Sequence, residues 1–297
     1  MRKRLEIPIV PGFSLAGDEI YHSLEYSTYY EPLRHVESVD CSGCTKRERL
    51  YCFTNFAGDL VFSLGLQIIE NNGMSLCSRV GDADSLFYRR DLAEEQDEKG
   101  RFKGIWTMDI DDDGTRSIGT LESQRDGYMK LWRFLGLNMP RLHYDTLSSR
   151  NVEKVLINDY PARLFCHESG WAVETNMHCG RVYMDYDDTV TINTDNGTLV
   201  NDEAISLVIR CRNRGIPVVL ISKHDGDLLR ELQDFGISGL FDEVLHLKRD
   251  SGAEKSDYIT EKDAILIDDS FGERWKAHEA RGINTFEPCM MELILND

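Results

Sequence analysis

Short apolar runs alternate with amphipathic segments over the last two fifths of the chain. In residues 201–215 the apolar positions recur at intervals of three and four, which lays one stripe along a helix; the stripe comprises Ala204, Leu207, Val208 and Cys211. Gly215 follows, as is typical of a helix end. Residues 216–222, "IPVVLIS", are apolar almost throughout, which predicts a strand buried on both faces.

The same alternation continues towards residue 297. Helices are expected over 225–236, with Leu228, Leu229, Leu232 and Phe235 facing inward, and over 272–282. Strands are expected at 181–185, 240–247, 263–269 and 282–288. Strand, helix, strand, helix predicts an α/β domain over residues 179–297, with a parallel sheet covered by helices on both faces.

Residues 1–178 have a different pattern, which predicts an α+β domain of unassigned function. Apolar stretches of hairpin length lie at 51–72, 85–92 and 100–110, and a helical pattern spans 122–137. The boundary between the two domains is expected within 172–180, "AVETNMHCG".

Charge and composition narrow the classes of partner. The chain has 34 Lys+Arg against 52 Asp+Glu, a net charge of -18, which disfavours general binding to nucleic acid or to an anionic membrane. No apolar run approaches the roughly 18 residues that cross a bilayer, and "MRKRLEIPIVPGF" lacks the core of a signal peptide. We therefore expect a soluble, cytoplasmic protein with reduced cysteines.

The stretch "VYMDYDDTVT" ends an apolar strand in Asp185, Asp187 and Asp188. Side chains two apart on a strand point to the same side, so Asp185 and Asp187 are expected to face one pocket. One carboxylate can attack phosphorus and form an aspartyl phosphate, while its neighbour acts as general acid and base. Crowded carboxylates need a cation, and Mg²⁺ prefers such oxygen ligands.

Three further positions belong to the same chemistry. Ser222 ends the strand "VVLIS", where its hydroxyl and backbone N–H are suited to phosphoryl oxygens. Lys255 is expected to supply positive charge for the nucleophile and the phosphoryl group; Lys248 in "LHLKRD" is the alternative, but Lys255 fits the start of a helix better. The strand "AILIDD" ends in Asp268 and Asp269, which are expected metal ligands together with Glu273.

These residues, in this order, resemble the four motifs of the haloacid dehalogenase (HAD) superfamily: DxDxT at Asp185, Asp187 and Thr189, then Ser222, Lys255 and Asp268-Asp269. The resemblance implies a Rossmann-like sheet, Asp185 as nucleophile, Asp187 as acid and base, and phosphate binding by Thr189, Ser222 and Lys255. It also implies Mg²⁺ held by Asp185, the Asp187 backbone carbonyl, Asp268 and Asp269.

The spacing of the motifs is similar to that of capless members, because neither interval has room for an inserted cap domain. Such open sites accept large substrates or are covered by another domain or subunit, and residues 1–178 are a candidate cover. The stretches "ISKHDGDL" and "IDDSFGER" also look like HAD-type domains appended to ATP-grasp, carbamoyl-phosphate-synthase-like proteins.

The cysteine cluster "CSGCTKRERLYC" raises a second kind of site. Cys41, Cys44 and Cys52, with His35 upstream, are candidate zinc ligands, although a second CxxC or HxxxH is missing and ordinary reduced cysteines fit better.

The sequence favours a Mg²⁺-dependent phosphatase acting on a phosphorylated substrate of unknown class. Two alternatives stay open: a non-catalytic or weakly catalytic HAD scaffold joined to a binding module, which zinc could stabilise, and phosphoryl transfer to an acceptor other than water. An oligomer or a partner protein also stays open.

Overall fold

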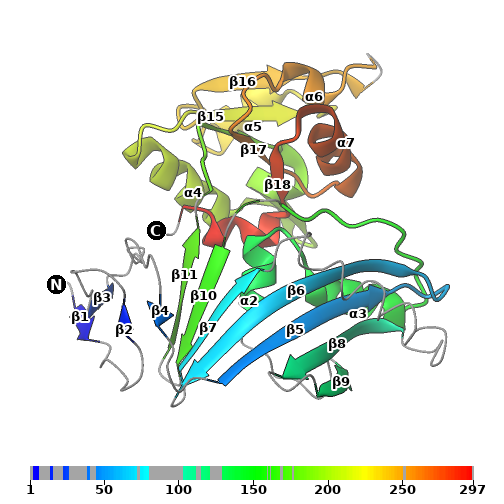
Figure 1. The fold of residues 1–297 in the computed structure, drawn as a ribbon. Helices are drawn as coiled ribbons and strands as arrows, with labels where there is room; N and C mark the ends of the chain where they lie inside the picture. Colours follow the sequence, from blue (N-terminus) through cyan, green and yellow to red (C-terminus); the bar gives the residue numbers. More distant parts are fainter. Residues whose placement is uncertain are drawn as a thin grey trace. The chain divides into compact units, whose positions relative to one another are not determined.

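The computed structural model divides the chain into two compact units, and each is described by itself (Figure 1). One unit comprises Met1–Val155, Tyr160–Asn176 and Asp297, and the other comprises Leu156–Asp159 and Met177–Asn296. The structure describes residues 3–6, 14–15, 23–26, 39–40, 45–71, 74–79, 103–111, 115–120, 129–158, 160, 162–167, 170–175, 177–249 and 252–295. The predicted mixture of α and β structure is confirmed, with one antiparallel and one parallel main sheet.

The first unit contains a seven-stranded antiparallel sheet in the order β11-β10-β7-β6-β5-β8-β9. Its strands are β5 (Thr45–Thr54), β6 (Leu60–Asn71), β7 (Met74–Arg79), β8 (Gly104–Asp111), β9 (Arg116–Thr120), β10 (Ala162–His167) and β11 (Gly170–Thr175). The short strands β1 (Lys3–Glu6) and β3 (Ser23–Tyr26) form one pair, and β2 (Ser14–Leu15) and β4 (Val39–Asp40) form another. The strands predicted within 51–72 and 100–110 are confirmed, whereas 85–92 lies outside the described residues.

Alternate side chains of β5 pack on opposite faces of this sheet. Leu50 and Cys52 join Trp106 and Met108 of β8 in one buried cluster. Tyr51, one residue on, meets Trp132 edge to face at 5.0 Å between ring centroids. Because residues 50–53 of β5 are buried on both faces, apolar side chains run continuously there instead of alternating with polar ones.

In the described part of the first unit, two helices accompany the sheet. Helix α2 (Met129–Phe134) lies within the predicted helix 122–137, of which residues 122–128 are outside the described residues. Helix α3 (Met139–Leu147) was not predicted; it begins after Asn138, whose side chain accepts a hydrogen bond from the N–H of Arg141.

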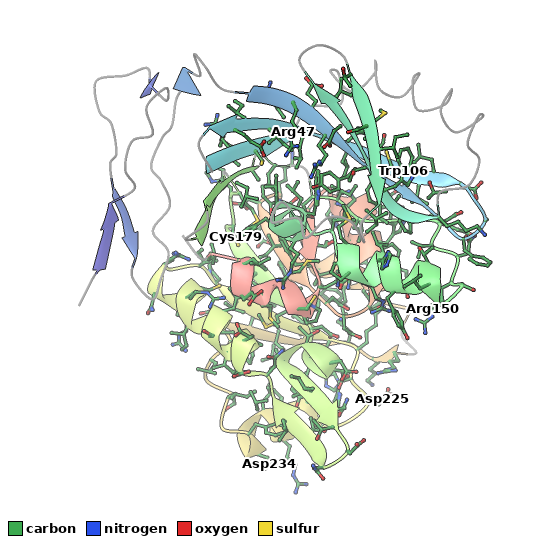
Figure 2. The ribbon with its side chains drawn as sticks, turned by 90° about the horizontal axis from the view of Figure 1, so that it is seen from below. Arg47, Trp106, Arg150, Cys179, Asp225 and Asp234 are labelled. Atoms are coloured by element: carbon green, nitrogen blue, oxygen red, sulfur yellow. The ribbon has the colours of Figure 1, made fainter. Side chains whose placement is uncertain are left out.

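An ion pair also links β5 to β6. Arg47 of β5, which is labelled in Figure 2, pairs with Glu70 of β6 at 2.8 Å.

The second unit is built on a five-stranded sheet in the order β16-β15-β12-β17-β18, and every neighbouring pair is parallel. The strands are β12 (Arg181–Met184), β15 (Val218–Ser222), β16 (Glu243–His246), β17 (Ala264–Ile267) and β18 (Asn284–Phe286), all at predicted positions. The chain builds outward from β12 on one side and then on the other. The carboxyl end of β12 is thus a point where the strand order reverses, which is where parallel sheets bind ligands.

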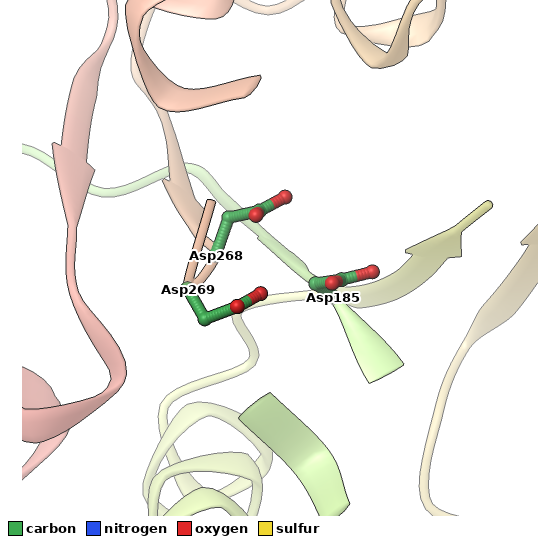
Figure 3. Close-up of side chains that lie close together, drawn as sticks. All are labelled: Asp185, Asp268 and Asp269. Atoms are coloured by element: carbon green, nitrogen blue, oxygen red, sulfur yellow. The ribbon is translucent and has the colours of Figure 1, made fainter. Parts of the chain in front are cut away.

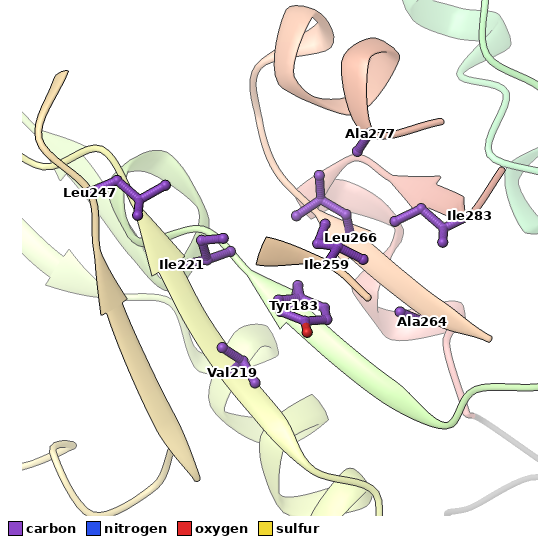
Figure 4. Close-up of a cluster of buried hydrophobic side chains, with 9 residues drawn as sticks. All are labelled: Tyr183, Val219, Ile221, Leu247, Ile259, Ala264, Leu266, Ala277 and Ile283. Atoms are coloured by element: carbon purple, nitrogen blue, oxygen red, sulfur yellow. The ribbon is translucent and has the colours of Figure 1, made fainter. Parts of the chain in front are cut away.

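The core on one face of this sheet contains nine buried residues (Figure 4). Tyr183, Val219 and Leu266 come from the three central strands, and Ala277 of α7 (Phe271–Arg281) covers them. Ile259 and Ile283 complete the packing. This apolar layer fixes the three strands whose carboxyl ends carry the predicted motifs.

The remaining elements of the second unit lie between these strands, except for the last one, which follows β18. They are the turn η2 (Tyr186–Val190), the hairpin β13 (Thr191–Thr194) and β14 (Gly197–Val200), helices α4 (Asp202–Asn213), α5 (Leu228–Asp234) and α6 (Lys255–Tyr258), and η4 (Pro288–Leu293). The predicted stripe of α4 is confirmed, because Ala204, Leu207, Val208 and Cys211 are its buried residues. The inward placement of Leu229 is wrong: it is 58% exposed, since α5 buries only Leu228 and Leu232. None of the helices in the described ranges has the length and apolar character required to cross a membrane.

Candidate active site

Asp185 directly follows β12 and is nearly buried, with 9% of its side chain exposed. Its backbone N–H donates to the carbonyl of Ile267, the last residue of β17, at 2.9 Å. The parallel register pairs Met184 with Ile267, so the residues that follow both strands lie side by side. Figure 3 shows the result: the carboxylates of Asp185, Asp268 and Asp269 gather at adjacent strand ends.

Lys255 places a buried ammonium group between two of these acids. It is the first residue of α6, and its Nζ lies 2.7 Å from Oδ1 of Asp185 and 2.6 Å from Oδ2 of Asp268. Burial lowers the pKa of Lys255, but Asp268 and Asp185 outweigh that effect and raise it above its ordinary value. The side chain is therefore charged and holds both carboxylates in place.

Asp268 is fully buried, and both of its carboxylate oxygens are engaged. Oδ2 contacts Lys255, and Oδ1 accepts a hydrogen bond from the N–H of Ser270 at 2.9 Å. Burial and the charge of Asp185 raise the pKa of Asp268, although Lys255 opposes them. Asp269 is exposed, and partial burial together with the charges of Asp185 and Asp188 raises the pKa of its carboxyl group.

The donor set fits a divalent cation with a preference for oxygen. One ligand atom from each of Asp185, Asp268 and Asp269 lies within 4.8 Å of the others. Among the described residues, these three form the group of side chains that could hold a metal ion. Three carboxylates face one ammonium group, which leaves a surplus of negative charge. Hard carboxylate oxygens with surplus negative charge are typical of Mg²⁺ sites.

Asp187 is not one of these three potential ligands, and it follows the end of the strand at Met184. Residues 186–190 form the tight turn η2, in which Asp188 has a left-handed φ of 52°. Strand alternation therefore does not apply to Asp187, because the strand ends at Met184, and the expectation that Asp185 and Asp187 face one pocket stays a prediction. Oδ1 and Oδ2 of Asp187 both lie 3.0 Å from Nδ1 of His224, and Oδ1 of Asp188 accepts from Asn193.

His224 is the neighbour of Asp187 that sequence reasoning missed. It lies two residues after Ser222, in the "SKH" that ends β15, and that position beyond a strand end was the available signal. Burial lowers the pKa of His224, but its hydrogen bonds to Asp187 and Glu231 more than compensate and raise it.

Two buried hydroxyl groups stand near these strand ends without a protein partner. Thr189 is fully buried in the turn η2, and Ser222 is 1% exposed at the end of β15. Within the part of the chain that the structure describes, neither Oγ1 of Thr189 nor Oγ of Ser222 has a hydrogen-bond partner. A buried hydroxyl without a partner is costly, so both are suited to an incoming polar group.

Glu273 was expected to be a metal ligand, but it is not part of the group formed by Asp185, Asp268 and Asp269. Its Oε1 lies 3.0 Å from Nζ of Lys223, which also contacts Glu254 at 2.9 Å. The next residue, Arg274, binds the backbone of the acidic pair. Its NH1 donates to the carbonyl of Asp269 at 3.0 Å, and its NH2 donates to Glu287 at 3.1 Å. Sequence reasoning missed this buried arginine.

The zinc candidates are mostly beyond what the structure describes. His35, Cys41 and Cys44 lie outside the described residues, so a zinc site stays a prediction. Cys52 is fully buried in the apolar cluster of β5 and β8, and its thiol forms no disulfide. Burial raises the pKa of the Cys52 thiol, which disfavours the thiolate form that binds zinc.

Comparison with protein-family models found no match, and neither did comparison with curated protein sequences. Solved structures with partial similarity include a HAD-superfamily hydrolase from Ehrlichia chaffeensis, at 17% identity over 37% of this chain and 91% of that chain, with a TM-score of 0.31. An uncharacterized protein from Listeria monocytogenes serotype 4b has 17% identity over 36% of this chain and 76% of that chain, with a TM-score of 0.31. N5-carboxyaminoimidazole synthetase from Staphylococcus aureus has 12% identity over 43% of this chain and 38% of that chain, with a TM-score of 0.32. At these identities and TM-scores, neither a family nor an activity follows from the matches.

Proposed function

We propose that residues 179–297 form a Mg²⁺-dependent phosphatase of the capless HAD type, which acts through an aspartyl phosphate on Asp185. The observation that carries the proposal is the buried ammonium group of Lys255 between Asp185 and Asp268, with Asp269 beside them. These side chains meet at the carboxyl ends of adjacent parallel strands, and a carboxylate held there by a cation is placed to attack a phosphorus atom.

In the first step, a carboxylate oxygen of Asp185 attacks the phosphorus of a phosphate monoester. A bond forms between that oxygen and phosphorus as the bond from phosphorus to the ester oxygen breaks. The carboxyl group of Asp187 gives its proton to the ester oxygen, which leaves as an alcohol. The hydroxyls of Ser222 and Thr189 are free to donate hydrogen bonds to the phosphoryl oxygens.

In the second step, water attacks the phosphorus of the aspartyl phosphate. Asp187, now a carboxylate, takes the proton from that water, and the bond from phosphorus to Asp185 breaks. Inorganic phosphate leaves and both aspartates return to their starting states. Lys255 offsets the negative charge of Asp185 throughout, at 2.7 Å from its Oδ1.

Asp185, Asp268 and Asp269 would hold Mg²⁺, together with the backbone carbonyl of Asp187 that the resemblance implies. Bound Mg²⁺ supplies positive charge that neutralises the charge developing on the phosphoryl oxygens. Since Oδ1 and Oδ2 of Asp268 already bind Ser270 and Lys255, Asp185 and Asp269 have the more available oxygens.

The test is phosphate release from a panel of phosphorylated metabolites, sugars, nucleotides and phosphopeptides, with Mg²⁺ and with EDTA. We expect Asp185→Asn to lower release by at least about 10³-fold, because the amide cannot act as the nucleophile. Asp195→Asn, an exposed acid in the loop of the β13–β14 hairpin, is the matched control and should keep full activity. Undiminished release by the Asp185→Asn protein would refute the mechanism, and silence across the panel would favour a scaffold.

A further inference from the structure

A row of polar side chains extends away from the carboxylate group and begins at Asp187. Nδ1 of His224 lies 3.0 Å from both carboxylate oxygens of Asp187. The opposite ring nitrogen, Nε2, lies 2.9 Å from Oε1 of Glu231 on α5. The hydroxyl of Tyr186 donates to Oε2 of the same glutamate at 3.0 Å. One imidazole ring thus joins the turn η2 to helix α5.

The packing leaves His224 little freedom to turn. Its side chain is 14% exposed, and its ring meets that of Tyr186 edge to face at 5.2 Å between centroids. A methyl group at Gly226 would lie 2.5 Å from Nε2 of His224 and 2.6 Å from Oε1 of Glu231. Position 226 therefore accepts only a residue without a side chain while the His224–Glu231 contact stays as it is.

Asp187 also forms an ion pair with an arginine. NH2 of Arg249 lies 3.9 Å from Oδ2 of Asp187, but the arginine side chain is 57% exposed. An exposed pair at that distance contributes little. The partly buried imidazole, bonded on both ring nitrogens, is thus the group that determines where the Asp187 carboxyl lies.

Resting on the proposed function, we infer that His224 is a positioning residue, which fixes the carboxyl group of Asp187 for proton transfer to the leaving oxygen while Glu231 and Tyr186 hold the imidazole. His224 touches neither the phosphorus nor the nucleophile in this assignment. It acts through Asp187, so losing it should impair only the proton transfer that Asp187 performs.

Two esters of nearly equal shape separate this role from a merely structural one. The leaving group of 4-nitrobenzyl phosphate is an alkoxide that needs a proton, whereas 4-nitrophenyl phosphate releases a stable phenolate that does not. We expect His224→Leu to lower kcat on the benzyl ester about 10²-fold, the usual contribution of acid–base catalysis, with KM unchanged. The fall on the phenyl ester should be less than about 10-fold.

Matched variants accompany this comparison. His224→Asn should regain part of the lost rate on the benzyl ester, since an amide N–H can replace Nδ1 as the donor to Asp187. Gly226→Ala should reproduce the selective loss by displacing His224 and Glu231. His178→Leu, an exposed histidine in the same unit, should match the wild type on both esters. An equal fall on both esters in the His224→Leu protein, or no fall on either, would overturn the inference.

A second measurement needs no turnover and so separates failure of this inference from failure of the proposed function. Hydrogen-bonded imidazole N–H protons give low-field proton NMR signals, and those of His224 are identified by their loss in His224→Leu. We expect Asp187→Asn to shift one of them and Glu231→Gln to shift the other. Signals of His224 that are indifferent to Asp187→Asn would contradict the positioning role.

Discussion

Lys255 is the side chain on which the arrangement of the acids depends most. With 3% of its side chain exposed, it lies between Asp185 and Asp268, which are 9% and 0% exposed. Taking the ammonium group away would leave two buried carboxylates without their shared counter-charge, and breaking such a pair typically costs about 3–5 kcal/mol.

We therefore expect Lys255→Met to lower the free energy of unfolding of its unit by about 3–5 kcal/mol in the presence of EDTA. The measurement is native-state hydrogen exchange of the β12 and β17 peptides, because a chain of two units does not unfold in one step. Lys276→Met is the control, since that lysine is 50% exposed in its pair with Glu254 and should cost less than about 1 kcal/mol. Equal exchange in Lys255→Met and the wild type would show that the buried pair is not stabilising.

Some site residues could be predicted from their place in the sequence, and others could not. Asp185 and Asp268 directly follow strands, Ser222 ends one and Lys255 begins a helix, and the parallel register brings the three strand-end positions to one edge of the sheet. The roles of His224 and Arg274 depend on which groups their side chains contact, and the spacing of apolar residues in the sequence does not indicate those contacts. The turn η2 is the clearest case, since it places Asp187 beside His224 three residues after the end of the strand.

Among the elements, the turn η2 depends on the helix that follows its hairpin. Asn201 caps α4 by accepting from the N–H of Glu203 at 3.2 Å. Its Nδ2 also donates to the carbonyl of Thr189 at 2.9 Å, and its N–H donates to Val190 at 2.8 Å. One buried side chain thus joins the start of a helix to the turn that carries Asp187.

Asn201→Ala should speed hydrogen exchange in α4 and in residues 186–190. The lost cap costs about 1 kcal/mol and the orphaned Thr189 carbonyl about 1–3 kcal/mol more. Asn138→Ala removes the cap of α3 in the other unit, and its effect should stay near about 1 kcal/mol and local to α3. Equal local effects of the two substitutions would contradict the link between Asn201 and the turn.

Helices were predicted well where their apolar stripe was long. Helix α4 has twelve residues and its stripe was assigned correctly, whereas α5 has seven residues and Leu229 was wrongly placed on its buried side. Helix α3 escaped prediction because its buried face includes the polar Asp145 and Thr146, which break the apolar period. Asp145 is buried there because it forms ion pairs with Arg141 and Arg150. The spacing of apolar residues along the chain does not indicate such ion pairs.

At the scale of the whole molecule, a short segment from before the parallel sheet completes that sheet. Residues 156–159 belong to the second unit, although β10 and β11 of the first unit follow them in the chain. Oδ1 of Asn158 accepts from the N–H of Thr285 at 2.9 Å, and Nδ2 donates to the Thr285 carbonyl at 3.0 Å. A side-chain amide thereby takes the place of a neighbouring strand at the edge strand β18. Nothing local in the sequence signals a contact between residues so far apart.

Asn158→Ala should destabilise the second unit, since it leaves two buried backbone groups of Thr285 unsatisfied at about 1–3 kcal/mol each. Hydrogen exchange of the peptide over β18 measures the effect. The control is Asn151→Ala: that residue accepts from the N–H of Ala57 at an exposed position, so its loss should cost less than about 1 kcal/mol. Unchanged protection of β18 in Asn158→Ala would refute the edge contact.

The aspartyl phosphate on Asp185 is the central claim, and trapping it is the most direct test. A substrate from the panel that the wild type hydrolyses is mixed with the enzyme, quenched in acid within one turnover, and the protein is digested for mass spectrometry. The account predicts a phosphoryl group on the peptide that contains Asp185, stable in acid, removed by hydroxylamine and absent from Asp185→Asn. Turnover with no phosphorylated Asp185, or with a phosphoryl group on another residue, would contradict it.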